Sequence, residues 1–242
     1  MNTLFGTVFR KACGACVDCD VRTMAVCAAL EEHEIGALER IMTSRTLTPD
    51  EMLVSEGDPL KRFYCLTSGV LRLSIALPDG RRQITGFLLP GDYLGLADDD
   101  FHSSSAEAIG DVRLCSFPAR EMNSLMEQYP KLKDRLHGFT RAALRQARDN
   151  QMILGRLSPV EKLACFLLTL STRSVEHKLA GNPLALPMSR TDIADYLGLT
   201  IETVSRSFTK LRNQGLIALP DPHLVELLDR GALEAVAGID FH

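Results

Sequence analysis

Long apolar runs are missing from this chain of 242 residues. No stretch reaches the roughly 18 apolar residues that a membrane-spanning helix needs, so we expect no association with a membrane. The chain does not start with an apolar run behind a basic head, so we expect no secretory signal and a cytoplasmic protein. No nucleophile–base set, phosphate-binding loop or paired-acid arrangement stands out, and we therefore do not expect an enzyme.

A strong charge of either sign is also missing, because the formal net charge is only −4. The chain has 45% hydrophobic and 24% charged residues, the proportions of a soluble globular protein with one large or two ordinary domains. This balance argues against indiscriminate binding to polyanions and is compatible with a locally basic, DNA-reading surface. The seven cysteines are an odd number and closely spaced, which favours a reducing cytoplasm over a disulfide framework.

Four of these cysteines follow one another near the start with the spacing C-x2-C-x2-C-x7-C: Cys13, Cys16, Cys19 and Cys27. Small and polar residues separate the first three, so the backbone can wrap several thiolates around one inorganic centre. Soft thiolate ligands favour zinc, copper(I) or an iron–sulfur cluster. The alternative, that these are buried free cysteines, suits such a polar segment poorly. We predict a metal or cluster site here.

Short strands punctuated by glycine follow from about residue 46 to residue 117. Leu71, Leu73 and Ile75 alternate with polar residues, which is the period of a half-buried strand. The turn signal Pro78-Asp79-Gly80 separates this strand from the next. These patterns predict an antiparallel sandwich or small barrel, preceded by a short amphipathic helix over residues 28–42.

Residues 121–157 are rich in helix formers and predict one long helix. A heptad seam runs along it and favours a parallel homodimer over a helix that packs only on its own domain. Asp149, beside the seam, would place like charges near each other across the dyad. The seam residues are Leu132, Leu136, Phe139, Ala143, Gln146, Asn150, Ile153 and Leu157.

A helix-turn-helix is predicted between residues 188 and 217. Ser189 with Asp192 forms a capping box, Gly198 ends the first helix, and Thr200 caps the second after a tight turn. The apolar runs on either side of residues 220–223 predict a β-hairpin wing. The exposed face of the second helix offers side chains that suit base edges, and basic residues nearby suit phosphates. The predicted DNA-binding residues are Glu202, Ser205, Arg206 and Thr209, with Arg190, Thr191, Lys210 and Arg212.

In this order, the cysteine arm, glycine-punctuated strands, long helix and helix-turn-helix resemble the bacterial CRP/FNR transcription regulators over nearly the whole chain. Four segments resemble the FNR-type oxygen sensors most: 83–87 (QITGF), 91–92 (GD), 196–200 (YLGLT) and 202–206 (ETVSR). The resemblance implies an α+β fold with a cluster-binding arm over residues 1–30 and a β-roll, the cyclic-nucleotide-binding type of jelly roll, over 31–120. A long dimerisation helix over 121–157 and a C-terminal winged helix-turn-helix over 158–242 would follow.

The resemblance also implies a [4Fe–4S] cluster held by Cys16, Cys19, Cys27 and the distant Cys115, with Cys13 as a substitute ligand. The x7 interval is longer than the x5 of the best-known members, so the lability of the cluster would differ. We expect Cys65 and Cys165 to be core residues. The implied partners are double-stranded DNA with palindromic TTGAT-type half-sites, read by Glu202, Ser205 and Arg206, and RNA polymerase, with turn 78–81 as a candidate contact.

Other effectors fit the sequence less well. Relatives that bind cyclic AMP hold its phosphate with an arginine, whereas the corresponding stretch here carries Asp98, Asp99 and Asp100 and no arginine, so we expect no cyclic nucleotide. A haem would rest on His102 alone, and a single loop histidine is more often solvated. Two rivals remain: a structural zinc site on the same cysteines, and a ferredoxin-like electron carrier, which would have no use for a helix-turn-helix.

Overall fold

The structure, a computed structural model, describes residues 19, 21–176 and 179–238. The chain divides into two units, one of residues 1–71 and 87–144 and the other of residues 72–86 and 145–242. Cys13 and Cys16 lie outside the described residues. Within the described part of the chain, no helix has the length and apolar character needed to cross a membrane.

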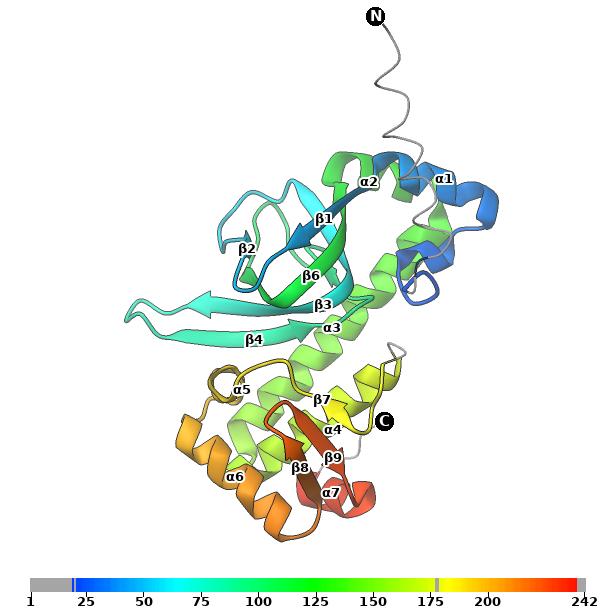
Figure 1. Ribbon diagram of the computed structural model, residues 1–242. Coiled ribbons are helices and arrows are strands. Elements are labelled where there is room, and N and C mark those ends of the chain that lie inside the picture. The colour runs from blue at the N-terminus through cyan, green and yellow to red at the C-terminus, as the bar shows by residue number, and fades with distance from the viewer. Residues whose placement is uncertain (1–18, 20, 177–178, 239–242) are drawn as a thin grey trace, which may run out of the picture. The chain divides into compact units, whose positions relative to one another are not determined.

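An antiparallel sheet with strand order β1-β6-β3-β4 forms the framework of the β-roll, with β2 paired to β6 and β5 paired to β3 (Figure 1). Gly69 shows why glycine punctuates these strands. Its φ is +84°, and a Cβ at this position would collide with the backbone oxygen of Asp111. The strands are β1 (Thr43–Leu47), β2 (Met52–Val54), β3 (Arg62–Ala76), β4 (Arg82–Leu88), β5 (Tyr93–Leu94) and β6 (Ser105–Pro118).

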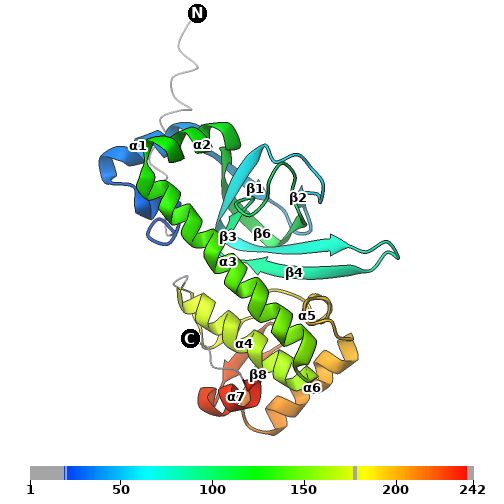
Figure 2. The same ribbon diagram turned by 180° about the vertical axis from the view of Figure 1, so that it is seen from behind.

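Helices cover one part of the roll in the first unit, where α1 (Glu32–Ile41) lies beside α2 (Ala119–Gln128) in both ribbon views (Figures 1 and 2). The helix predicted over residues 28–42 begins later, at Glu32, because Glu31 and Glu34 form its capping box. A short 3-10 helix, η1 (Val26–Ala29), precedes it. The buried core between these helices includes Leu38, Phe117 and Met122.

The prediction of one helix over residues 121–157 is wrong, because the chain breaks at Tyr129. Helix α2 ends at Gln128, and α3 (Pro130–Arg156) starts at a proline. Proline has no N–H to continue the hydrogen-bond ladder, and it drives the preceding residue away from helical geometry. Tyr129 accordingly adopts φ −121° and ψ 88°.

Along the first turns of α3, the residues of the predicted heptad seam are buried in the core of their own chain. Leu132 and Leu136 are 0% and 3% exposed and belong to the core of the first unit, with Phe139 packed against it. Farther along α3, Leu144, Met152 and Leu154 are exposed. None of these three residues belongs to the predicted seam.

The second unit contains the predicted winged helix-turn-helix. Helix α5 spans Arg190–Leu197 and α6 spans Ile201–Asn213, and β8 (Ile217–Asp221) and β9 (Leu224–Leu227) form the predicted wing. Helix α4 (Pro159–Glu176) contacts α6 and α7 (Arg230–Ala237), as Figure 2 shows from behind. No sequence pattern predicted α7 or the strand β7 (Leu184–Ala185), which pairs with β9.

Candidate functional site

The first candidate site gathers cysteines from three parts of the first unit. Cys19 and Cys27 come from the N-terminal arm, and Cys115 comes from β6, where it pairs with Ser44 of β1. All three are partly buried against the same apolar core, to which the fully buried Cys65 of β3 belongs. The structure therefore brings together three of the four predicted cluster ligands, and the fourth, Cys16, lies outside the described residues.

Residues 21–26, which precede Cys27, form compact turns. The Arg22 N–H donates to the Cys19 carbonyl at 3.0 Å, and the Ala25 N–H donates to the Val21 carbonyl at 2.8 Å. Val21 and Ala25 are buried, so apolar burial holds these turns against the roll. These turns place Cys27 close to Cys19 in spite of the longer interval between them.

The cysteines affect one another electrostatically. The pKa of Cys27 is raised to about 12, first by burial and then by the neighbouring Cys115 and Cys19. Burial raises the pKa of Cys65 well above its usual value, and the same three cysteines add to the effect. Without a cation these groups stay protonated thiols. A positively charged centre would reverse this balance, because coordination deprotonates a thiol.

Polar contacts hold the arm beside these thiols. The Val26 N–H donates to the Tyr93 hydroxyl at 2.7 Å, one residue before Cys27. Tyr93 pairs with Cys65 across β5 and β3, and its hydroxyl is hydrogen-bonded to the Cys65 side chain. From α3, Arg135 Nη2 donates to the Met24 carbonyl at 2.7 Å. The arm is therefore fixed to both the sheet and the start of α3.

The thiol side chains are of the right chemical type for a metal or cluster. The described thiols are not close enough together to bind one, and the fourth predicted ligand lies outside the described residues. Among the residues that the structure describes, no three Cys, His, Asp or Glu side chains are placed so that they could hold a metal ion. Cys19 and Cys115 are close enough to raise the pKa of Cys27, but the thiols are not at ligand spacing. Loading would therefore require Cys16 and a local closure of the arm.

His102 is buried, contrary to the expectation of a solvated loop histidine. It is 3% exposed, and its Nδ1 lies 3.3 Å from Asp98 Oδ2. Asp98 Oδ1 also accepts a hydrogen bond from the Ser103 N–H at 3.2 Å. The contact with Asp98 and the burial give His102 a structural role within the loop between β5 and β6.

The second candidate site is the helix-turn-helix of the second unit. The capping box is present: the Asp192 N–H donates to Ser189 Oγ at 3.1 Å, and Asp192 Oδ2 accepts from the Ser189 N–H at 2.9 Å. Gly198 ends α5 with φ 62° and ψ 43°, the left-handed geometry expected of this glycine. Thr200 Oγ1 accepts from the Thr203 N–H at 3.2 Å and starts α6.

Helix α6 separates its residues by face as predicted. Val204, Phe208 and Leu211 are buried. The residues predicted to read bases are all exposed: Glu202, Ser205, Arg206 and Thr209. A shallow hollow in the exposed face is lined by Ser205, Arg206, Thr209, Lys210, Asn213 and Gln214. The major groove of DNA admits a single α-helix, so α6 could present this polar face to the edges of the bases.

The predicted phosphate-contacting residues differ in environment. Thr191, Lys210 and Arg212 are exposed. Arg190 is half-buried and lies over the Phe208 ring, with its Cζ 3.5 Å from the ring centroid, and burial lowers its pKa. Arg190 therefore also links α5 to α6 through a cation–π contact.

The predicted dimer-interface residues in the second half of α3 belong to the second unit. Asp149 is exposed and Gln146 is half-buried. The Tyr196 hydroxyl donates to Asn150 Oδ1 at 3.0 Å, so Asn150 has a partner in its own chain. Ile153 is 9% exposed, whereas Ala143, in the first unit, is exposed.

Sequence reasoning missed several residues that position these sites. Tyr93 holds the cysteine arm, and Lys162 of α4 donates from Nζ to the Leu197 carbonyl at the end of α5 at 3.3 Å. Neither residue carries a local pattern, because both act across long separations along the chain. Tyr93 directly follows the segment 91–92 that carries the family resemblance, and Lys162 had no such signal.

Two family models match the chain: a Crp-like helix-turn-helix domain over residues 161–236 and a cyclic nucleotide-binding domain over residues 44–129. The nitrogen fixation regulation protein FixK of Bradyrhizobium diazoefficiens is 46% identical over 92% of this chain and 93% of its own length. The transcriptional activator protein FnrL of Cereibacter sphaeroides is 34% identical over 93% and 92% of the two chains. The solved structure of FixK2 from Bradyrhizobium japonicum superposes with a TM-score of 0.77 at 35% identity, covering 83% of this chain and all of that one.

Proposed function

The chain belongs to the CRP/FNR family of DNA-binding transcription regulators, and from this premise we propose that it is an oxygen-responsive regulator of the FNR type. A [4Fe–4S] cluster on Cys16, Cys19, Cys27 and Cys115 would favour a homodimer that binds palindromic TTGAT-type operators when oxygen is low. A bacterial transcription regulator binds chromosomal DNA, which lies in the cytoplasm, so we propose a cytoplasmic location.

The observation that carries this proposal is the convergence of Cys19, Cys27 and Cys115 beside one apolar core. These residues are up to 96 positions apart, and burial among three thiols raises the pKa of Cys27 to about 12. Packing alone would not require three cysteines at one place. A soft cation or cluster would accept their thiolates and offset the cost of burying them.

When bound, an iron–sulfur cluster would supply reactivity toward dioxygen. The other parts of the response belong to the chain. Tyr93 and Arg135 hold the arm to the roll and to the start of α3 through the Val26 N–H and the Met24 carbonyl. Because α3 carries the predicted dimer seam, we propose that the state of the arm changes how firmly two protomers associate. A dimer engages both half-sites at once, whereas a monomer loses that avidity.

We also propose contact with RNA polymerase through turn 78–81, since several relatives are named transcriptional activators. In this turn the Gly80 N–H donates to the Leu77 carbonyl at 3.0 Å, and Asp79 and Arg81 form an exposed ion pair at 2.7 Å. A cyclic nucleotide is not part of the proposal, because the three aspartates 98–100 would repel its phosphate.

The deciding experiment is an absorption spectrum with an iron and sulfide count on protein kept free of oxygen, before and after exposure to air. We expect a straw-brown protein that bleaches in air. A colourless protein that contains zinc would establish the zinc alternative, in which the same thiols hold a structural ion. Protein with neither metal would refute both assignments.

Cys115→Ala tests the link from the cysteines to DNA, with Cys165→Ala as the matched control. Cys165 is a buried cysteine of α4 in the second unit, so its truncation removes a thiol without touching the proposed site. We expect Cys115→Ala alone to lose anaerobic iron, dimerisation and operator binding. If Cys115→Ala bound the operator as well as the parent, the proposed link would be wrong.

A further inference from the structure

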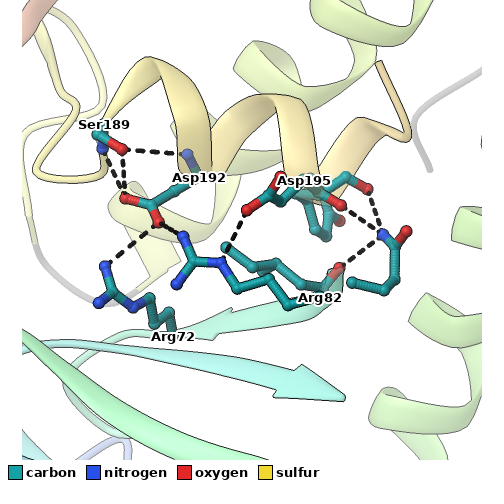
Figure 3. Close-up of polar contacts among 8 residues, drawn as sticks. Arg72, Arg82, Ser189, Asp192 and Asp195 are labelled. Atoms are coloured by element: carbon teal, nitrogen blue, oxygen red, sulfur yellow. Dashed lines mark hydrogen bonds and ion pairs between the residues drawn. The ribbon is translucent and has the colours of Figure 1, made fainter. Parts of the chain in front are cut away.

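Four charged side chains join the outer part of the β3–β4 hairpin to helix α5 within the second unit (Figure 3). Arg82 Nη2 lies 2.8 Å from Asp192 Oδ1, and Arg82 Nε lies 2.8 Å from Asp195 Oδ2. Arg72 Nη1 approaches the same oxygen of Asp192 at 3.2 Å. Figure 3 shows the two arginines pointing from the hairpin toward α5 and the two aspartates pointing back. We name these residues, Arg72, Arg82, Asp192 and Asp195, the hairpin clamp.

Asp192 is the centre of the clamp. Its side chain is 3% exposed, and its two oxygens have separate tasks. Oδ2 accepts from the Ser189 N–H at 2.9 Å and from Ser189 Oγ at 2.7 Å, which completes the capping box. Oδ1 accepts from Arg72 and Arg82. The start of α5 needs only the first oxygen, so the two arginines do something other than cap the helix.

The contact with the hairpin extends along α5. Gln83, next to Arg82 in β4, donates from Nε2 to the carbonyl of Asp195 at 2.6 Å and to that of Tyr196 at 3.3 Å. These carbonyls lie in the last turn of α5, where no intrahelical donor remains. Asp192 and the last-turn carbonyls are thus held by one hairpin, which restricts both tilting and rotation of the helix.

The orientation of α5 determines that of α6. The two helices contact each other, and Arg190 of α5 stacks on Phe208 of α6. The clamp is therefore coupled to the exposed face that carries Ser205 and Arg206. The other end of the link is covalent: β3 runs without interruption from Cys65, in the cysteine site, to Arg72 in the clamp.

We propose that the hairpin clamp orients the helix-turn-helix for its operator, with Arg82 and Arg72 as positioning residues that touch no DNA. While the clamp ties the helix-turn-helix to β3, the two α6 helices of a dimer would fit only one spacing between the half-sites. Released from the clamp, the helix-turn-helix would tolerate several spacings and bind each of them more weakly. The inference requires the DNA binding of the family and is independent of the iron–sulfur proposal.

Arg82→Gln tests the clamp, because it removes the charge and the fork that bridges two carboxylates. We expect about tenfold faster hydrogen exchange over residues 190–197 and an operator dissociation constant raised about tenfold. The preference for a TTGAT palindrome over the same palindrome lengthened by one base pair should shrink. Arg82→Lys keeps the charge but not the fork, so it should fall between parent and Arg82→Gln. Adding Asp195→Asn to Arg82→Gln should cause little further loss.

Arg45→Gln is the matched control. Arg45 forms an exposed ion pair with Glu51 at 3.6 Å, so its loss changes the net charge equally without touching the clamp. All assays are run well below the lowest melting temperature of the set. Exchange over residues 190–197 that is equal in Arg82→Gln and Arg45→Gln would overturn the clamp. Faster exchange with unchanged affinity and spacing preference would reduce it to a stabilising contact and also overturn the proposal. If the parent failed to bind the palindrome, the operator assignment would be wrong, and equal exchange in Arg82→Gln and Arg45→Gln would still overturn the clamp.

Discussion

At the scale of single residues, Tyr93 fixes the cysteine arm through one hydrogen bond. Tyr93→Phe would leave the Val26 N–H without its acceptor in a buried place, at a cost of about 1–3 kcal/mol. We expect about tenfold faster hydrogen exchange at Val26 and easier proteolysis of residues 19–30, even in metal-free protein. Tyr129→Phe is the control, because no hydrogen bond of the Tyr129 side chain is found among the described residues. Equal exchange in the two variants would remove Tyr93 from the arm's anchorage.

Arg206 and Lys210 are neighbours on α6 that should differ in what they recognise. Arginine pairs bidentately with guanine, so Arg206→Ala should cost about 1–3 kcal/mol of binding and relax the preference at one base pair. Lys210 is a predicted phosphate contact, and Lys210→Ala should weaken binding to all sequences equally and lower the salt slope by about one. Titrations against the palindrome and its single-base variants at two salt concentrations test both. Identical specificity profiles for the two variants would contradict the division of roles.

At the scale of elements, the helix-turn-helix depends on the cap of α5. Ser189→Ala removes the oxygen that accepts the Asp192 N–H, and we expect a loss of about 0.5–2 kcal/mol in the free energy of unfolding. Urea unfolding followed by circular dichroism measures it. Ser124→Ala is the control, because Ser124 is exposed on α2 and, among the described residues, its hydroxyl donates to the Arg120 carbonyl alone. A parent-like urea midpoint for Ser189→Ala would show that packing, not capping, fixes the start of α5.

The sequence predicted an element well where the residues that determine its ends lie within a few positions of one another. The capping box, Gly198 and the cap at Thr200 specify α5 and α6 with little reference to the rest of the fold, and the structure confirms them. The break at Tyr129 was also readable, since Pro130 cannot continue a helix, but the run of helix formers over residues 121–157 outweighed the proline. Strand β7 was not readable, because two residues gain strand geometry only by pairing with β9.

At the scale of the whole molecule, the sequence predicted the order of the parts but not the contacts across long separations. The convergence of Cys27 with Cys115 came from family resemblance, since 88 residues separate them and no periodicity relates them. Nothing in the sequence paired Arg82 with Asp195, because charged residues are common and their partners depend on tertiary geometry. The assignment of 72–86 to the unit of the helix-turn-helix has the same origin.

If two copies of the chain associate along α3 as proposed, like charges beside the seam should weaken the dimer. Asp149 is exposed, and beside the predicted seam two copies would face each other across the dyad. Two like charges about 4 Å apart repel by about 1 kcal/mol in water, so Asp149→Asn should tighten the dimer about fivefold. Sedimentation velocity in air measures this, with Asp134→Asn, exposed on α3 but off the seam, as the control. Salt at about 1 M screens the repulsion, so it should strengthen the parent's dimer and leave that of Asp149→Asn nearly unchanged. If both variants responded to salt like the parent, Asp149 would lie outside the interface, and the oxygen response would need a different element to separate the protomers.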